Sequence, residues 1–451
     1  MIETMFNKIN RLLVISLLAT IPALLLAQNN SRRPVPINRC NEYNSINDAV
    51  RNASWLKKLS LSNKNLNVLS PSIGQLQDLE YLDLSNNNLS SLPNEILRLT
   101  KLREIRLNNN RFTNFPAELL QIPSLEVIIL SGNQISTLPH SIGNLRNLLV
   151  LDLSSNNFTK EPREIAHLAK LKELYLANNQ IRNLECFAPS SLELLDLNNN
   201  KLSAISSDIG KFSNLKKLYL GNNQLKALPK EFGKLYNLEY LDLQNNEISA
   251  LPDEFCSLNS LNNINLNSNR IVIFPDCIER MRNLVHISIA SAKNSSVPQN
   301  LFKFRNLIFI DISNNRLTSL PSGIQQQQNL TSIIAANNNF DDIPHEIFSL
   351  RKLRHLDFSS NNLTYVNKSI RNLNNLNSLY LNRNFISSLP EELVELRNCR
   401  IILLESNQIR SFPQNLRQLV NLKVLDLKSN PLSDNEKDRL RRLLPNTRLS
   451  F

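Results

Sequence analysis

Leucines recur at a fixed spacing, L-x-x-L-x-L-x-x-N-x-L, along most of this chain, seventeen times between residues 56 and 432. Fifteen of the sixteen intervals between copies are 23 residues, and the step from Leu171 to Leu192 is 21. This regularity predicts a repeat protein in which every copy forms the same local structure. The seventeen opening residues are Leu56, Leu79, Leu102, Leu125, Leu148, Leu171, Leu192, Leu215, Leu238, Leu261, Leu284, Leu307, Leu330, Leu353, Leu376, Cys399 and Leu422.

The repeat at residues 79–101 illustrates the elements that this pattern predicts. Leu82 and Leu84 are two residues apart, so a strand would direct both into the core, while Asp83 between them would point outward. Pro93 fixes its own φ and is tolerated at the start of a helix, so a short helical turn is expected after it. Twelve of the repeats carry proline at this place. Each repeat therefore predicts one strand and one helical turn.

Repeats of this kind stack on their neighbours and need no central core. Successive strands would pair in parallel at about 4.8 Å, which gives a sheet on the order of 80 Å long. The predicted fold is an α/β solenoid of seventeen repeats. Its parallel β-sheet would curve along the concave side, and its helical turns would line the convex side.

An asparagine follows the strand in fifteen of the seventeen repeats; Lys64 and Ala292 are the exceptions. Backbone polar groups inside the bend after a strand must find partners, and an amide offers both donors and an acceptor. We expect these residues to form a structural ladder. They are Asn87, Asn110, Asn133, Asn156, Asn179, Asn200, Asn223, Asn246, Asn269, Asn315, Asn338, Asn361, Asn384, Asn407 and Asn430.

The two ends of the chain differ from the repeats. Residues 1–27 combine Lys8 and Arg11 with an apolar run of 15 residues and end at Ala27, a pattern typical of a cleaved signal peptide rather than a stable membrane span. Residues 28–55 are expected to form an N-terminal cap that includes a short helix. Residues 433–451 are expected to form a C-terminal helical cap, because Ser433 or Asp434 can cap a helix.

Segments such as SLPHSIGNLRNL and ALPKEFGKLYNL carry a resemblance to a known family. The chain resembles exported bacterial leucine-rich-repeat proteins with 23-residue repeats of the L-P-x-x-I-G-x-L subtype, which also occurs in Ras-pathway scaffolds and related plant proteins. The resemblance covers residues 56–432. It implies recognition of a protein or a polysaccharide on a curved scaffold, without catalysis, and it does not identify the ligand.

Charge and cysteine content add little to this picture. The net charge of +12 is compatible with an excess of lysine and arginine dispersed over the surface, and no basic stripe is interleaved with aromatic residues, which argues against nucleic acid.

None of the five cysteines has the spacing of a metal or redox motif. Cys256 and Cys277 lie on the outer side of neighbouring repeats at different places in the repeat. Buried or isolated thiols are therefore the favoured interpretation, with a disulfide between these two as the alternative.

The sequence lacks the motifs of an enzyme or a cofactor-binding protein. It contains no phosphate-binding glycine loop, no nucleophile motif and no cluster of metal ligands. His286 and His355 both occupy outward strand positions, but they are three repeats apart, about 14 Å, which is too far for one metal ion. We expect no enzymatic activity, no cofactor and no metal.

The outward strand positions are the best place to seek a binding site. Seven aspartates occupy the central position of these strands, which gives the concave face an acidic row although the protein is basic overall. Aromatic side chains of amphipathic character dominate interface hot spots and also stack on sugars. Two patches stand out, although both also fit ordinary cross-strand packing. The first comprises Tyr175, Leu194, Asp196, Lys217, Tyr219, Tyr240 and Asp242; the second comprises His286, Phe309 and Asp311.

The leading hypothesis is an exported protein, secreted or held at the cell surface or in the periplasm, that binds a protein partner on its concave sheet. One alternative is a carbohydrate-binding adhesion module that uses the same tyrosines. Another is a cytoplasmic signalling scaffold, which would follow if residues 1–27 are not a signal. Cleavage after Ala27 would exclude this last alternative.

Overall fold

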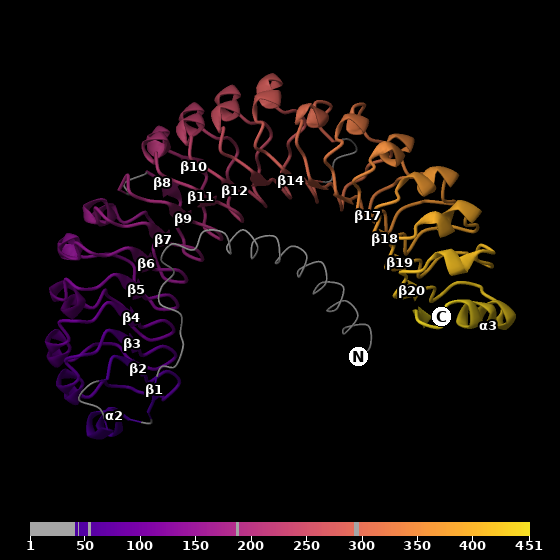
Figure 1. The fold of residues 1–451 in the computed structure, drawn as a ribbon. Coiled ribbons are helices and arrows are strands. Elements are labelled where there is room, and N and C mark those ends of the chain that lie inside the picture. Colours follow the sequence, from indigo (N-terminus) through magenta and orange to yellow (C-terminus); the bar gives the residue numbers. More distant parts are fainter. Residues whose placement is uncertain (1–40, 44, 53–55, 186–188, 293–296) are drawn as a thin grey trace.

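The computed structural model describes residues 41–43, 45–52, 56–185, 189–292 and 297–451. The expected signal peptide at residues 1–27 and the first part of the expected N-terminal cap lie outside these residues. The described chain forms a wide arc in which strands line the inner side and short helical turns line the outer side (Figure 1). This is the predicted α/β solenoid with a concave parallel sheet.

The inner side of the arc is one parallel sheet of nineteen strands. Seventeen of them come one from each repeat, and each pairs in register with the strand of the next repeat, as Leu218 does with Leu241. The strands are β1 (Asn41–Glu42), β2 (Lys58–Ser60), β3 (Tyr81–Asp83), β4 (Glu104–Arg106), β5 (Val127–Ile129), β6 (Val150–Asp152), β7 (Glu173–Tyr175), β9 (Leu194–Asp196), β11 (Lys217–Tyr219), β12 (Tyr240–Asp242), β13 (Asn263–Asn265), β14 (His286–Ser288), β15 (Phe309–Asp311), β16 (Ser332–Ile334), β17 (His355–Asp357), β18 (Ser378–Tyr380), β19 (Ile401–Leu403), β20 (Val424–Asp426) and β21 (Arg448–Ser450).

The outer side of the arc carries 3₁₀ turns of three to five residues, which are too short for regular α-helices. Most begin directly after proline, as the turn at Asn94–Arg98 does after Pro93. The turns are η1 (Pro71–Gln75), η2 (Asn94–Arg98), η3 (Ala117–Gln121), η4 (His140–Asn144), η5 (Arg163–His167), η6 (Ser207–Lys211), η7 (Lys230–Lys234), η8 (Asp253–Ser257), η9 (Asp276–Arg280), η10 (Leu301–Lys303), η11 (Ile324–Gln326), η12 (His345–Ser349), η13 (Lys368–Asn372), η14 (Glu391–Glu395) and η15 (Leu416–Gln418).

The short repeat that opens at Leu171 has a different outer side. The structure has no 3₁₀ turn in the described part of this repeat, and a second, two-stranded sheet lies nearby. In this small sheet, β8 (Asn183–Leu184) pairs in parallel with β10 (Ala204–Ile205) of the next repeat. The pairing keeps the two repeats aligned although one of them is two residues shorter.

Leucine and isoleucine side chains fill the space between the sheet and the turns. Leu82, Leu84 and Ile96 are 0% exposed, and the same positions are buried in repeat after repeat. Because every repeat buries its apolar side chains against two neighbours, the core runs along the whole arc.

The asparagines that follow the strands form a hydrogen-bonded ladder through the core. The Nδ2 group of Asn246 donates to Leu220 O (2.9 Å), Leu243 O (3.0 Å) and Gln244 O (3.2 Å). Its Oδ1 atom accepts from Leu225 N (3.0 Å) in the preceding repeat. Fourteen of the fifteen asparagines are buried, and Asn430 in the last repeat is half-buried. Each amide thus satisfies buried backbone groups of two successive repeats.

The residue before each ladder position adopts a left-handed backbone conformation, with φ between 52° and 67° in all seventeen repeats. Asparagine, serine or glycine occupies this place in sixteen of them, and Arg383 is the exception. Asparagine tolerates this conformation better than most residues, and glycine adopts it without strain. The turn that places the ladder amide in the core therefore favours a residue that tolerates a positive φ, which is asparagine, serine or glycine in almost every repeat.

Helices close the described arc at both ends. The helix α2 (Ile46–Asn52) lies beside the first repeat, and β1 pairs with β2. The helix α3 (Asp434–Leu443) begins after Ser433, whose side chain accepts from Glu436 N, and β21 then pairs with β20. None of the helices in the described part of the chain has the length and apolar character of a membrane span.

Candidate binding surface

The register of the sheet decides which outward side chains are neighbours. Pairing places Tyr219 between Asp196 and Asp242, and Lys217 between Leu194 and Tyr240. One row on the concave face therefore alternates acid and tyrosine across five successive strands. This row, which we call the Asp–Tyr row, consists of Asp152, Tyr175, Asp196, Tyr219 and Asp242.

Two of the three tyrosines in the first predicted patch contact each other. The ring centroids of Tyr219 and Tyr240 are 5.0 Å apart, and the ring planes are tilted by 38°. Tyr175 lies two strands away from Tyr219, and its hydroxyl donates to Glu173 Oε2 (2.8 Å). The patch is thus a tyrosine pair and a separate tyrosine oriented by its own glutamate.

All three tyrosines are half-buried neutral phenols. Burial raises the pKa of Tyr219 to about 12 and raises the pKa values of Tyr175 and Tyr240 above the ordinary range. At neutral pH each ring presents an apolar face together with a hydroxyl that can donate or accept. That combination is typical of interface hot spots.

The aspartates of the Asp–Tyr row are held by backbone amides and not by cations. Asp196 Oδ1 accepts from Asn198 N (2.9 Å), and Asp242 Oδ1 accepts from Gln244 N (3.0 Å). Burial raises the pKa of Asp242, which is 4% exposed, to about 6, and it also raises the pKa of Asp196. The nearby Lys216 forms its ion pair with Glu193 (2.9 Å) instead. The ion pairs of the described residues leave Asp152, Asp196 and Asp242 without a basic partner.

The second predicted patch offers less surface. The rings of His286 and Phe309 lie 6.0 Å apart at 42°, but Phe309 is only 8% exposed. The His286 Nδ1 atom is buried and has no hydrogen-bond partner among the described residues, and burial lowers the pKa of this imidazole. Asp311 accepts from Ser288 Oγ (3.2 Å) and Ser313 N (2.9 Å). The polar groups of this second patch are therefore either hydrogen-bonded within the sheet or buried.

A third aromatic pair lies further along the same face. His355 and Tyr380 on β17 and β18 contact edge to face, with centroids 4.8 Å apart at 83°. Burial lowers the pKa of His355 to about 4, so this ring is neutral at physiological pH. The spacing of His286 and His355 had argued against a shared metal ion, and the contact of His355 with Tyr380 was not predicted. In the described chain, no group of three or more His, Cys, Asp or Glu side chains is placed to hold a metal ion.

Comparison with known proteins shows the same architecture elsewhere. The family described as "Leucine-rich repeat region" matches residues 33–131 and 176–315, and "Leucine rich repeat" families match residues 123–181, 306–327 and 328–386. A leucine-rich-repeat protein of Leptospira interrogans is 33% identical, covers 92% of this chain and 100% of its own, and superposes with a TM-score of 0.75. The chain belongs to the leucine-rich-repeat family.

Two other solved structures are less similar in sequence. The PEPR1–AtPEP1 structure is 26% identical over 81% of this chain and 60% of its own, with a TM-score of 0.51. A chain of the Drosophila Toll–Spätzle complex is 22% identical over 84% of this chain and 54% of its own, with a TM-score of 0.71, a likeness that concerns the fold alone. Among curated proteins, no sequence matches this leucine-rich-repeat chain.

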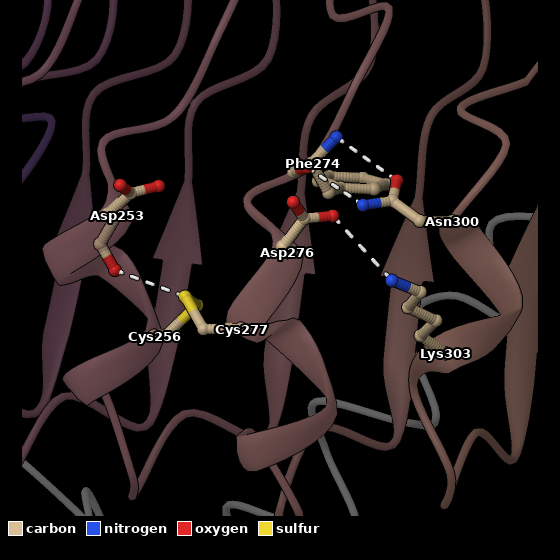
Figure 2. Close-up of a disulfide and its surroundings, with 7 residues drawn as sticks. All are labelled: Asp253, Cys256, Phe274, Asp276, Cys277, Asn300 and Lys303. Carbon is tan, nitrogen blue, oxygen red and sulfur yellow. Dashed lines mark hydrogen bonds and ion pairs between the residues drawn. A yellow bond between two sulfur atoms is a disulfide. The ribbon is translucent and has the colours of Figure 1, made fainter.

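The interpretation of Cys256 and Cys277 as isolated thiols is wrong. The two residues form a disulfide between the turns η8 and η9, with Cα atoms 5.9 Å apart (Figure 2). Their different places in the repeat had counted against pairing. In this leucine-rich-repeat chain the outer turns of adjacent repeats lie side by side, so the late part of one turn faces the early part of the next. Cys399 is buried in the core and unpaired.

A second asparagine ladder, which was not predicted, lies at the edge of the solenoid just before eight of the repeats begin. Each of these side chains donates from Nδ2 to a backbone carbonyl of the preceding repeat, at 2.7–3.0 Å. The signal was present, because asparagine directly precedes the opening residue in many repeats. The participants are Asn147, Asn214, Asn237, Asn283, Asn306, Asn375, Asn398 and Asn421.

Proposed function

We propose that this protein is an exported, non-enzymatic recognition protein that binds a protein or peptide partner on its concave sheet. The observation that carries the proposal is the Asp–Tyr row, in which Asp196 and Asp242 flank Tyr219 and have no basic partner. The adjacent ring of Tyr240 completes the contact surface. A cationic segment of a partner would supply the missing positive charges, and the tyrosine rings would pack against its side chains.

The cost of burying unpaired carboxylates favours a cationic partner at this row. A buried carboxylate without a cation is destabilised, which is why the pKa of Asp242 is raised. A lysine or arginine from a partner would remove part of this penalty and would gain charge-assisted hydrogen bonds. Because the sheet already holds the Tyr219 and Tyr240 rings, little side-chain entropy would be lost on binding.

Further observations support export, a bacterial origin and a peptide or protein partner. Disulfides persist mainly in oxidising compartments, so the Cys256–Cys277 bond agrees with the signal-like segment at residues 1–27. The similarity to the Leptospira interrogans protein supports a bacterial origin. The PEPR1–AtPEP1 structure offers a precedent for a partner on this kind of scaffold. No cofactor enters the proposal.

The test is capture of partners by the full chain from surface and culture fractions, read by mass spectrometry. The wild type is compared with the variant Tyr175→Ala, Tyr219→Ala, Tyr240→Ala, after thermal unfolding has verified that both are folded. A protein retained by the wild type and lost by the variant would support the proposal. A protein retained equally by both would overturn the concave site, and competition by free sugars would favour the carbohydrate-binding alternative.

A further inference from the structure

One edge of the solenoid, formed by the residue directly before each strand, changes its charge between the two halves of the arc. In the first half, lysine or arginine in one repeat pairs with glutamate in the next. Lys57 lies 2.9 Å from Glu80, and Arg103 lies 2.8 Å from Glu126. Glu193 pairs with Lys172 (2.7 Å) on one side and with Lys216 (2.9 Å) on the other. Positive and negative charges are balanced along this half of the edge.

The last repeats keep the positive charges at this edge and lose the acids. Arg354, Asn377, Arg400 and Lys423 occupy the place before β17, β18, β19 and β20. Backbone hydrogen bonds connect them in sequence: Asn377 N donates to Arg354 O (2.7 Å), Arg400 N to Asn377 O (2.8 Å) and Lys423 N to Arg400 O (2.8 Å). They therefore follow one another at roughly the strand spacing of about 4.8 Å.

Two more arginines flank this line. Arg351 and Arg397 precede Arg354 and Arg400 by three positions, at the end of the preceding repeat. The second asparagine ladder holds their backbone, because Asn375 Nδ2 donates to Arg351 O (2.8 Å) and Asn421 Nδ2 donates to Arg397 O (2.8 Å). The five basic side chains are exposed, and the ion pairs of the described residues include none of them. We call this set the basic edge: Arg351, Arg354, Arg397, Arg400 and Lys423.

Acidic residues are absent from the surrounding edge positions. The edge places are the two residues before and the one residue after each of the opening residues Leu353, Leu376, Cys399 and Leu422. These twelve places hold six basic residues, five asparagines and Val420, and no Asp or Glu. The nearest glutamates in sequence belong to the outer turn η14, where Glu391, Glu392 and Glu395 line a surface hollow together with Arg397. Arg354, Arg400 and Lys423 therefore have no acid beside them along the edge, whereas Arg397 borders the glutamates of η14.

We propose that the basic edge binds a linear anionic polysaccharide that carries sulfate or carboxylate groups. Guanidinium groups bind such anions in bidentate fashion, and cations carried by the edge at intervals of one or two strand spacings, about 5 to 10 Å, suit a chain with regularly spaced charges. The edge offers no aromatic side chain for stacking on nucleic acid bases. Val420, 70% exposed, is its single large apolar side chain, which is too little to insert into a lipid surface. This site is separate from the Asp–Tyr row and does not depend on it.

The test compares two triple variants of the full chain that lose the same number of positive charges. One is R354Q/R400Q/K423Q at the basic edge. The matched control, K57Q/R103Q/K172Q, changes the same edge in the first half, where acids already neutralise the cations. Binding to immobilised heparin is measured at several salt concentrations, and thermal unfolding verifies that both variants are folded. The basic-edge variant should bind about tenfold more weakly or worse and depend less on salt, whereas the control should keep nearly all its affinity.

Three outcomes would overturn the proposal: no binding of the wild type to heparin, equal losses in the two variants, or binding to anionic phosphatidylglycerol vesicles without binding to heparin. Equal losses would mean that net charge alone controls binding. Preference for vesicles would assign the edge to a membrane surface. None of these outcomes bears on the concave site.

Discussion

Tyr219 and Tyr240 contact each other across β11 and β12, with ring centroids 5.0 Å apart, next to the carboxylate of Asp242. Tyr219 belongs to the Asp–Tyr row and Tyr240 to the adjacent row of outward side chains, so their contact joins the two rows. A partner that reaches this point meets aromatic surface and an unpaired acid together.

The ladder amides should contribute strongly to stability. Asn246→Ala would remove three donated bonds and one accepted bond in the core, so we expect a loss of about 1–3 kcal/mol. Urea unfolding followed by circular dichroism measures the effect. Asn263→Ala, on the concave face of β13, is the control and should shift the midpoint little. Equal shifts in both variants would contradict the structural role of the ladder.

Stability should decrease as pH rises through the titration of Asp242. Folding raises the pKa of this carboxyl from 3.8 to about 6, so the folded state binds the proton more tightly than the unfolded state. The free energy of unfolding therefore falls between about pH 4 and pH 6, and Asp242→Asn should remove this loss. At pH 7.5 the variant should be more stable by up to about 3 kcal/mol, and below pH 4 the advantage should disappear.

Denaturant unfolding of the wild type and Asp242→Asn at a series of pH values measures this difference. Asp208→Asn, at the exposed turn η6, is the control and should give no gain in stability at neutral pH. A difference between wild type and Asp242→Asn that does not change with pH would show that burial of this charge is not its cause.

The disulfide should stabilise the middle of the arc. Cys256 and Cys277 are 21 residues apart, and closing a loop of that length contributes about 3 kcal/mol in the chain-entropy account. C256A/C277A should lower the unfolding midpoint, and reductant should lower the midpoint of the wild type but not of the variant. Insensitivity of the wild type to reductant would show that the bond contributes nothing to stability.

This disulfide also lies near the one interior interruption of the ladder. Ala292 replaces the ladder asparagine in the repeat that opens at Leu284. Across the neighbouring outer turns, Asn300 accepts from Phe274 N (3.2 Å) and donates to Phe274 O (2.8 Å), and Lys303 lies 3.6 Å from Asp276 (Figure 2). These contacts connect the repeats on the convex side where the core ladder is incomplete.

The sequence predicted the fold well because one physical requirement recurs in every repeat. The spacing of Leu82 and Leu84 specifies a strand with one buried face, and Pro93 starts the outer turn, so seventeen copies specify a solenoid. The register followed from the spacing of the strand positions, which is 23 residues on either side of Tyr219. It places Tyr219 beside Asp196 and Asp242.

Side-chain contacts were predicted less well than the fold, above all where the two side chains occupy different positions in their repeats. The Cys256–Cys277 bond joins unlike places in two repeats, so a comparison of equal positions gives it no support. The hydrogen bond from Tyr175 to Glu173 separates that tyrosine from the Tyr219–Tyr240 pair, and no periodicity indicates it. Such contacts depend on rotamers and on the curvature of the sheet, which the repeat pattern alone does not specify.

The most direct test of the proposed function is the affinity of the captured partner for two matched variants. Tyr219→Ala with Tyr240→Ala removes the concave pair, whereas Tyr236→Ala with Tyr365→Ala removes two exposed tyrosines that lie outside the sheet. Isothermal titration calorimetry should show a loss of about 2 kcal/mol or more for the concave variant and nearly wild-type affinity for the control. Equal affinity of the concave variant and the wild type would contradict binding at the Asp–Tyr row.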